Sequence, residues 1–110
     1  MGSLLAKRLN YSFFDTGTMY RAFTWKALNS GISVEDESKL GQLARITKFD
    51  FILHQGETIP ILIDNQDVST ESSGPEVEEQ VSLIAKVAEV RRRLVSEQRK
   101  LAQRGELIMA

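Results

Sequence analysis

The segment at residues 15–21 reads DTGTMYR and holds the side chains of this sequence best suited to binding an anion. It follows a short apolar stretch at residues 12–14, so a strand is predicted to pass through a glycine-bearing turn into a helix. Free N–H groups and the positive end of the dipole favour a phosphate at the start of a helix. Arg21 lies in the first turns, where a cation opposes the dipole unless an anion is bound. The placement predicts an anion site, with an ion pair from Arg21 to Asp15 or Glu35 as the structural alternative.

Composition limits the classes of function. The 110 residues are 42% hydrophobic and 26% charged, which is typical of one small globular domain. A net charge of −1 provides no overall field that would attract nucleic acid or an anionic membrane. The absence of cysteine excludes disulfides and thiolate metal sites. The sequence has a single histidine, His54, which argues against a histidine-based zinc site or a Ser-His-Asp triad. It is predicted to be a surface residue near a hairpin turn.

Neither a membrane-spanning segment nor a signal peptide is predicted from the sequence. No apolar run approaches the length of a membrane span. The first nine residues lack the apolar core and the cleavage site of a signal peptide. A cytoplasmic location without a membrane partner is therefore expected.

Helices are predicted on both sides of the strand at residues 12–14. Residues 3–9 resemble the end of a helix that has no cap of its own. The helix from about residue 17 to residue 29 is expected to stop at Gly31, and its apolar positions cover more than one stripe, which predicts burial on two sides. Residues 33–36 resemble a capping box for a third helix.

From Phe49 onward, the apolar residues recur with a period of two instead of the helical period, which predicts antiparallel strands. Apolar and polar residues alternate over 49–54 and again over 59–63, on either side of a glycine turn, which is typical of a hairpin. Pro60 places an unpaired edge or a bulge in the second strand. A second turn is predicted at residues 64–67, with a short third strand beginning at Val68.

Two further helices and a strand complete the pattern. Ser73 is predicted to cap the first helix, with Pro75 in its first turn and Glu76 completing a capping box. The second helix, about 88–103, carries several basic residues, and the apolar residues 106–110 read as a strand.

Together these features resemble the bacterial-type cytidylate kinases, which transfer the γ-phosphoryl group of ATP to CMP or dCMP. The motif at residues 14–22 resembles the strand-to-helix motif of that family's substrate domain. Its monophosphate-binding domain is matched by Asp67-Val68-Ser69, Glu76-Val77, the stretch 81–85 and Val90-Arg91. The resemblance covers essentially all 110 residues.

The resemblance implies an α/β fold of the P-loop nucleoside monophosphate kinase type. A parallel sheet with helices would carry a small antiparallel three-stranded insert at about 49–69, inside a monophosphate-binding region of about 16–105. The strands at 12–14 and 107–109 should then pair in parallel. Residues 72–75 depart from the Ile-Arg-Thr-like stretch common in the family, so any role of that arginine is expected to be filled differently.

The resemblance also implies substrate-binding residues. Thr16 matches the hydroxyl residue at the mouth of the CMP site, and Arg21 matches the arginine that binds the CMP phosphate. Ser82 and Arg91 match residues that meet the cytosine ring. Tyr20 either lines the pocket or is a half-buried core residue. The implied site places no catalytic residue and no metal ligand in this chain.

Each cytosine-binding assignment has a structural alternative. Ser82 fits the polar side of a helix, and Arg91 fits a solvated member of the run at 91–93. Arg92 and Arg93 are predicted to be surface or salt-bridge residues.

ATP and Mg²⁺ are the co-substrate and the metal that the resemblance implies. In the family, a P-loop of the form G-x-x-x-x-G-K-[ST] precedes the helix matched by residues 3–9, and a Gly-Arg-Asp motif follows the strand matched by 107–109. Neither motif occurs in this sequence. Reading frames on either side are therefore expected to encode them. The 110 residues alone are expected to be inactive and of low stability, and the complete enzyme to be a monomer with no nucleic-acid partner.

Two other functions remain open at this point. A uridylate or adenylate kinase would keep the fold and change the base, and the preference among CMP, dCMP and UMP stays undecided. A non-catalytic helical interaction module would use the basic residues between 91 and 104 to bind an acidic partner or RNA.

Overall fold

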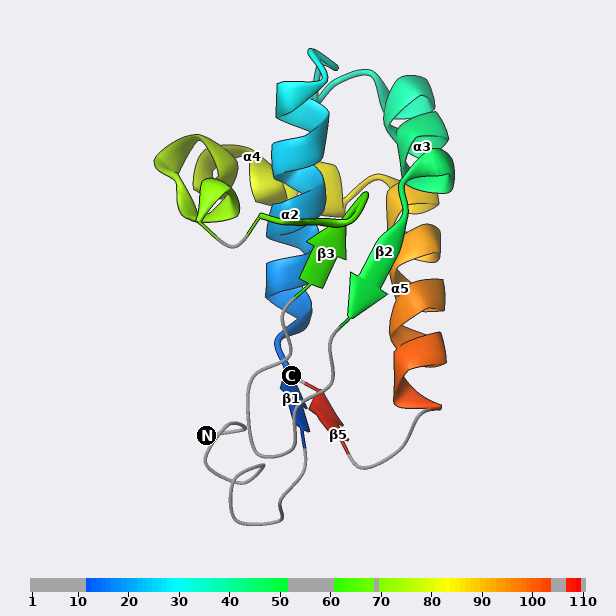
Figure 1. Cartoon of the computed structure of the whole chain (residues 1–110). Helices are drawn as coiled ribbons and strands as arrows, with labels where there is room; N and C mark the ends of the chain where they lie inside the picture. The colour runs from blue at the N-terminus through cyan, green and yellow to red at the C-terminus, as the bar shows by residue number, and fades with distance from the viewer. Residues whose placement is uncertain (1–11, 52–60, 69, 104–106, 110) are drawn as a thin grey trace.

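The computed structural model describes residues 12–51, 61–68, 70–103 and 107–109 (Figure 1). The predicted helix at residues 3–9, the surface position of His54 and the edge or bulge at Pro60 lie outside the described residues.

Two short strands far apart in the sequence lie side by side. β1 (Ser12–Phe14) pairs in parallel with β5 (Leu107–Met109), and the first residues of the two strands lie opposite each other, as do the last. A parallel pair needs a long crossover, which the intervening helices provide. The predicted parallel pairing of these segments is confirmed.

Helix α2 (Thr16–Asn29) occupies the middle of the molecule (Figure 1). It begins because the Asp15 carboxylate accepts a hydrogen bond from the Gly17 N–H (2.9 Å). It ends at Ser30, and Gly31 follows with a φ of 73°, a conformation that glycine adopts without strain. α2 packs against α4, η1 and β3, as its several apolar stripes predicted.

Helix α3 (Glu37–Ile46) starts at a different cap from the predicted one. Asp36 is the N-cap residue, and its carboxylate accepts a hydrogen bond from the Lys39 N–H (3.1 Å). The Ser33 hydroxyl instead accepts from the Glu35 N–H (3.2 Å) in a local turn. The predicted capping box is therefore wrong, because the serine satisfies a nearer donor before the helix begins.

The antiparallel sheet has the order β2-β3-β4, formed by Phe49–Phe51, Ile61–Ile63 and Gln66–Asp67. Asp64 and Asn65 connect the last two strands, and both have positive φ, as two-residue hairpin turns require. A third strand is present, as predicted, but it spans Gln66–Asp67, so its predicted start at Val68 and the predicted turn over residues 64–67 are wrong. A two-residue turn suffices to connect it to β3.

The start of α4 (Pro75–Ala85) also corrects a prediction. A short 3-10 helix, η1 (Glu71–Ser73), precedes it, and the Ser73 hydroxyl donates to the Thr70 carbonyl (2.7 Å). The residue at the N-cap position is Gly74, and its cap lacks a side-chain hydrogen bond. Ser73 does not cap the helix, because η1 places it one residue too early.

Helix α5 (Ala88–Ala102) runs beside α3 and leads back to β5 (Figure 1). One core joins helices α2, α3, α4 and α5 to strands β2 and β3. Its largest fully buried side chains are Phe23, Met19, Leu40, Ile61, Ile63, Ile84, Leu94, Leu101, Val68 and Val90. Among the helices that the structure describes, none is both long and apolar enough to cross a membrane.

An ion pair ties the antiparallel sheet to α2. Lys26 Nζ lies 2.6 Å from Asp64 Oδ2, and Asp64 Oδ1 accepts a hydrogen bond from the Lys48 N–H (3.0 Å). The hydrogen bond from the Lys26 side chain, followed by that from the Lys48 backbone, holds the pKa of Asp64 below its ordinary value of 3.8. The ionised carboxylate therefore stabilises the folded state.

We expect Asp64→Asn to lower the free energy of unfolding at pH 7 by about 0.5 kcal/mol, because the pair is partly exposed. Asparagine tolerates the positive φ and can still accept the Lys48 N–H. A lowered folded-state pKa contributes stability above pH 3.8 that is lost as the pH falls through the folded-state pKa, so the two proteins should converge at low pH. Urea unfolding between pH 2 and 7 measures this, and Lys26→Gln should add nothing to Asp64→Asn in the double variant.

Candidate functional site

The start of α2 gathers charge around Arg21. Its guanidinium donates a hydrogen bond to the Thr18 hydroxyl (3.2 Å). It lies 3.9 Å from Asp15 Oδ2 and 3.9 Å from Glu78 Oε1 of α4, and 32% of its side chain is exposed. The predicted ion pair with Asp15 is present, and the second carboxylate is Glu78 rather than Glu35. Both distances are at the outer limit for ion pairs, so the guanidinium keeps donors for another anion.

Gly17 allows this guanidinium to approach the helix. A Cβ atom at this position would lie 3.1 Å from Arg21 Nη1 and 3.1 Å from Asp15 Oδ1. Either neighbour would then have to move. The glycine therefore serves the close approach of a cation to the first turn, where the backbone N–H groups also favour an anion.

The other predicted residues of α2, Thr16 and Tyr20, are both partly buried. Thr16 is the first helical residue and is half-buried. Tyr20 is partly buried and packs against the core, and its carbonyl accepts a hydrogen bond from the Thr24 hydroxyl (2.8 Å).

Ser82 lies on α4 and Arg91 on α5, and both side chains are exposed. Ser82 lies one turn after Glu78 on α4, so these two residues share a face of the helix. Because Glu78 contacts Arg21, that face of α4 is turned toward the start of α2. Sequence reasoning missed Glu78, since a contact between residues far apart in the chain leaves no periodic signal.

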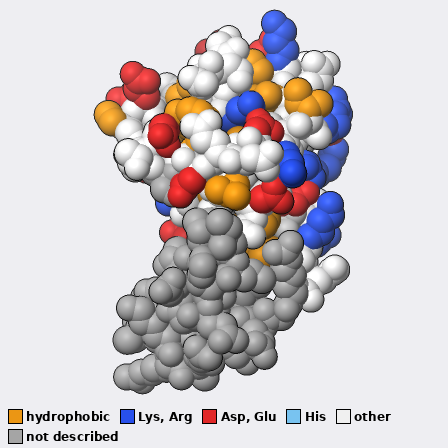
Figure 2. Space-filling model, in the orientation of Figure 1, with side chains coloured by type: hydrophobic (Ala, Val, Ile, Leu, Met, Phe, Trp, Pro, Cys, Tyr) orange, Lys and Arg blue, Asp and Glu red, His pale blue; other side chains and the backbone are white. Residues whose placement is uncertain are grey.

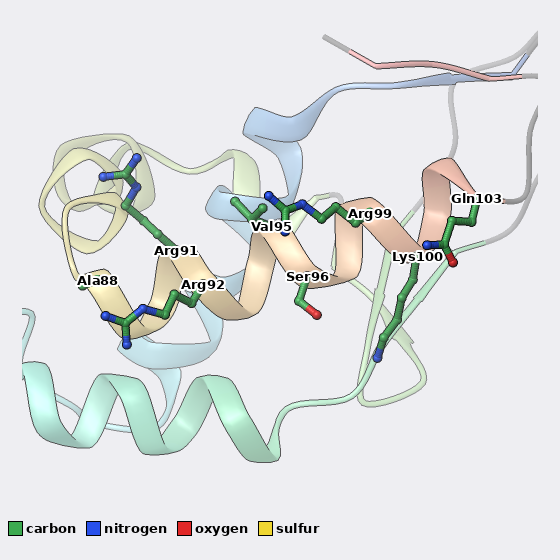
Figure 3. A pocket seen from close by; sticks show the side chains of 8 residues that line it. All are labelled: Ala88, Arg91, Arg92, Val95, Ser96, Arg99, Lys100 and Gln103. Atoms are coloured by element: carbon green, nitrogen blue, oxygen red, sulfur yellow. The ribbon is translucent and has the colours of Figure 1, made fainter.

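Arg91 lines a pocket of about 690 Å³ on the outer face of α5 (Figure 3). Four cations border this pocket, namely Arg91, Arg92, Arg99 and Lys100. Figure 3 shows Arg92 extending toward α3 and Arg91 extending to the other side of α5. Thr16, Tyr20, Arg21 and Ser82 are not among its lining residues, so the structure leaves the predicted site residues in two groups.

The cations of this pocket differ in their partners. Arg92 pairs with Glu89, and Lys100 Nζ lies 3.4 Å from Glu97 Oε1. Within the part of the chain that the structure describes, Arg91 and Arg99 have no carboxylate partner. Figure 2 shows Lys and Arg side chains along the right-hand edge, where α3 and α5 lie in Figure 1. The outer face of α5 is therefore suited to a ligand with acceptor atoms or negative charge.

Arg92 and Arg93 both form salt bridges, as predicted, but only Arg92 is exposed. Arg93 is half-buried and makes further contacts to α3 and β2. These contacts were not predicted from the sequence.

Comparison with known proteins gives one consistent result. The sequence matches the family described as cytidylate kinase over residues 1–110. A cytidylate kinase of Chloroflexus aggregans is 39% identical over 112 residues, covering 99% of this chain and 49% of that protein. One from Caldanaerobacter subterraneus is 42% identical over 105 residues, covering 96% of this chain and 45% of its own length. The chain spans about half the length of the curated relatives it matches.

Replacement of the residue that caps α2 tests the local structure of this site. We expect Asp15→Ala to lower the free energy of unfolding by about 1 kcal/mol, because the Gly17 N–H loses its acceptor. Asp15→Asn retains an acceptor oxygen and should cost only a few tenths of that amount, about 0.3 kcal/mol. Urea denaturation of the two variants distinguishes them, and equal losses would show that the charge of Asp15 matters more than its capping bond.

Proposed function

Since this chain belongs to the cytidylate kinase family, we propose that it supplies the CMP-recognition part of an ATP-dependent kinase acting on CMP or dCMP. The observation that carries the proposal is the match to that family along the whole chain, residues 1–110. The product would be CDP or dCDP, formed when an oxygen of the monophosphate takes the γ-phosphoryl group of ATP.

The proposed fold is that of the P-loop nucleoside monophosphate kinases. The parallel pairing of β1 with β5 supports it, because the family requires adjacent parallel strands at these positions. The antiparallel sheet of β2, β3 and β4 would be the insert, at about 49–69, within a monophosphate-binding region of about 16–105.

Arg21 would bind the phosphate of CMP. The planar fork of a guanidinium can donate two parallel hydrogen bonds to phosphate oxygens. Its present ion pairs are long, and its position at the start of α2 favours negative charge nearby. Thr16 would stand at the mouth of this site and Tyr20 along its wall.

Ser82 and Arg91 would bind the cytosine ring. Cytosine offers two acceptors, O2 and N3, and an exocyclic amine that donates. The Arg91 fork can donate to both acceptors, and the Ser82 hydroxyl can accept from the amine. The exposure of both side chains and the lack of a carboxylate partner for Arg91 in the described residues support this role.

ATP and Mg²⁺ are the co-substrate and the metal that the family implies, and the residues that the structure describes offer no site built for them. In the ranges that the structure describes, no three carboxylate, histidine or cysteine side chains converge to hold a metal ion. The sequence also lacks the glycine-rich motif that cradles nucleotide phosphates. We therefore assign CMP binding to this chain and derive no step that involves ATP or the metal. The enzyme would be a cytoplasmic monomer acting on small nucleotides, without a nucleic-acid partner.

The test uses a completed kinase, in which this chain replaces the matched region of the Chloroflexus aggregans relative. We expect it to phosphorylate CMP in preference to UMP and AMP. A coupled assay of ADP release with each acceptor measures kcat/KM. A preference for UMP or AMP would contradict the cytidine assignment, and no turnover with any monophosphate would contradict the kinase proposal.

In that enzyme, Arg21→Ala and Arg91→Ala should lower kcat/KM for the three acceptors in different patterns. Arg21→Ala removes a charged partner of a phosphate that every acceptor carries. We expect it to cost about 1.5–3 kcal/mol, or about tenfold to 150-fold in kcat/KM, whatever the base. Arg91→Ala removes contacts to the edge of cytosine and should weaken CMP more than UMP or AMP.

The exposed Arg45 of α3, replaced by alanine, is the matched control and should leave all three values unchanged. Equal proportional losses across the three acceptors for Arg91→Ala would assign Arg91 to the solvated basic run instead.

A further inference from the structure

Arg93 differs from its two neighbours in the run of arginines at 91–93. Arg91 and Arg92 are exposed, whereas only 24% of the Arg93 side chain is exposed. Two residues along a helix correspond to a rotation of about 200°, so Arg91 and Arg93 leave α5 on nearly opposite sides. A contact that holds Arg93 on one side of α5 therefore also sets the side from which Arg91 leaves the helix.

Arg93 binds the end of α3. Its Nε donates to the Ala44 carbonyl (3.0 Å), and its Nη2 donates to the Thr47 carbonyl (3.1 Å). The helical donor to Ala44 would be the Lys48 N–H, but that group donates to Asp64 across the antiparallel sheet. Arg93 thus supplies hydrogen bonds that α3 loses where the chain leaves it for β2. A cation at the end of a helix is also favoured by the helix dipole.

The guanidinium of Arg93 also covers an aromatic ring of the sheet. Its Cζ atom lies 5.3 Å from the centroid of Phe49, the first residue of β2. The Phe49 ring in turn lies 6.4 Å from the ring of Phe23 on α2. A continuous line of contacts therefore joins α5 to α2 through the sheet. Phe23 lies two residues after Arg21, just as Arg93 lies two residues after Arg91.

Glu97 holds the guanidinium in place. It lies one turn further along α5, forms an ion pair with Arg93, and has only 11% of its side chain exposed. Arg93 therefore makes contacts of three kinds, to two carbonyls, one carboxylate and one ring. Lysine has a single rotatable ammonium group and cannot reproduce this arrangement.

We propose that Arg93 is a positioning residue, which fixes the rotation of α5 and the position of the antiparallel sheet relative to it. Arg91 can then contact cytosine while Arg21 binds the phosphate. This inference rests on the proposed function. Arg93 does not contact the substrate in this arrangement and acts through Arg91.

The experiment compares Arg93→Lys with Arg45→Lys in the completed kinase. Arg45 is the matched control, because it also joins α3 to α5, through one exposed ion pair with Glu89 (3.6 Å). We expect Arg93→Lys to raise the KM for CMP by about tenfold and to lower the preference for CMP over UMP, with the KM for ATP unchanged. Arg45→Lys should change none of these.

A double variant separates positioning from stability. If Arg93 acts through Arg91, then adding Arg93→Lys to Arg91→Ala should leave the CMP-to-UMP ratio of kcat/KM at the value of Arg91→Ala alone. Glu97→Gln is milder, since Arg93 keeps its carbonyl partners, and should shift the ratio in the same direction by a smaller factor. It provides the same test if Arg93→Lys fails to fold.

The outcomes separate this inference from the function on which it rests. An Arg93→Lys enzyme with a lower Tm but with the CMP-to-UMP ratio of the Arg45→Lys control would overturn the positioning role and leave the kinase assignment intact. The positioning role would also be overturned if the effects of Arg91→Ala and Arg93→Lys on the CMP-to-UMP ratio were fully additive in the double variant. A completed parent enzyme that does not phosphorylate CMP would overturn both.

Discussion

The two-sided burial of α2 is the constraint on which the rest of this structure depends. Its fully buried side chains include Met19, Ala22, Phe23 and Ala27, and it packs against α4, η1 and β3. A helix covered on several sides cannot rotate without exposing apolar surface, at about 25 cal/mol for each Å². The position of Arg21 at its first turns is therefore fixed by the core and not by the ion pairs of Arg21 itself, which are long.

Helix α5 is held differently from α2, because it is apolar on one side only and strongly basic on the other. Val90, Leu94 and Leu101 are buried, while Arg91 and Arg99 face a pocket on the outer surface. Such a helix can bury its apolar stripe in slightly different rotations. Directional contacts, such as those of Arg93 with two carbonyl groups, select one of them. Polar contacts here specify geometry, and apolar burial supplies stability.

Much of this fold could be predicted from the sequence, because the spacing of apolar residues reflects the elements that bury them. The period of 3.6 residues in α3 and α5 and the period of two around β2 and β3 are imposed by the same apolar surfaces that form the core. The two predicted serine caps were wrong because Ser33 and Ser73 satisfy nearer backbone groups, and spacing does not decide between local partners. The contact of Glu78 with Arg21 and the contacts of Arg93 with α3 and β2 were missed because these partners are distant in the chain. The roles of Thr16, Tyr20, Arg21, Ser82 and Arg91 come from resemblance and stay predictions.

The carboxylates beside Arg21 explain how the partly buried start of α2 can carry a cation. Asp15 and Glu78, each 3.9 Å away, offset the unfavourable interaction of Arg21 with the α2 dipole. Because all three side chains are partly exposed, each attraction contributes only about 1 kcal/mol or less. A phosphate that accepts two short hydrogen bonds from the same fork competes well with two long ion pairs. The carboxylates would then orient the guanidinium without satisfying it, as the proposed phosphate site requires.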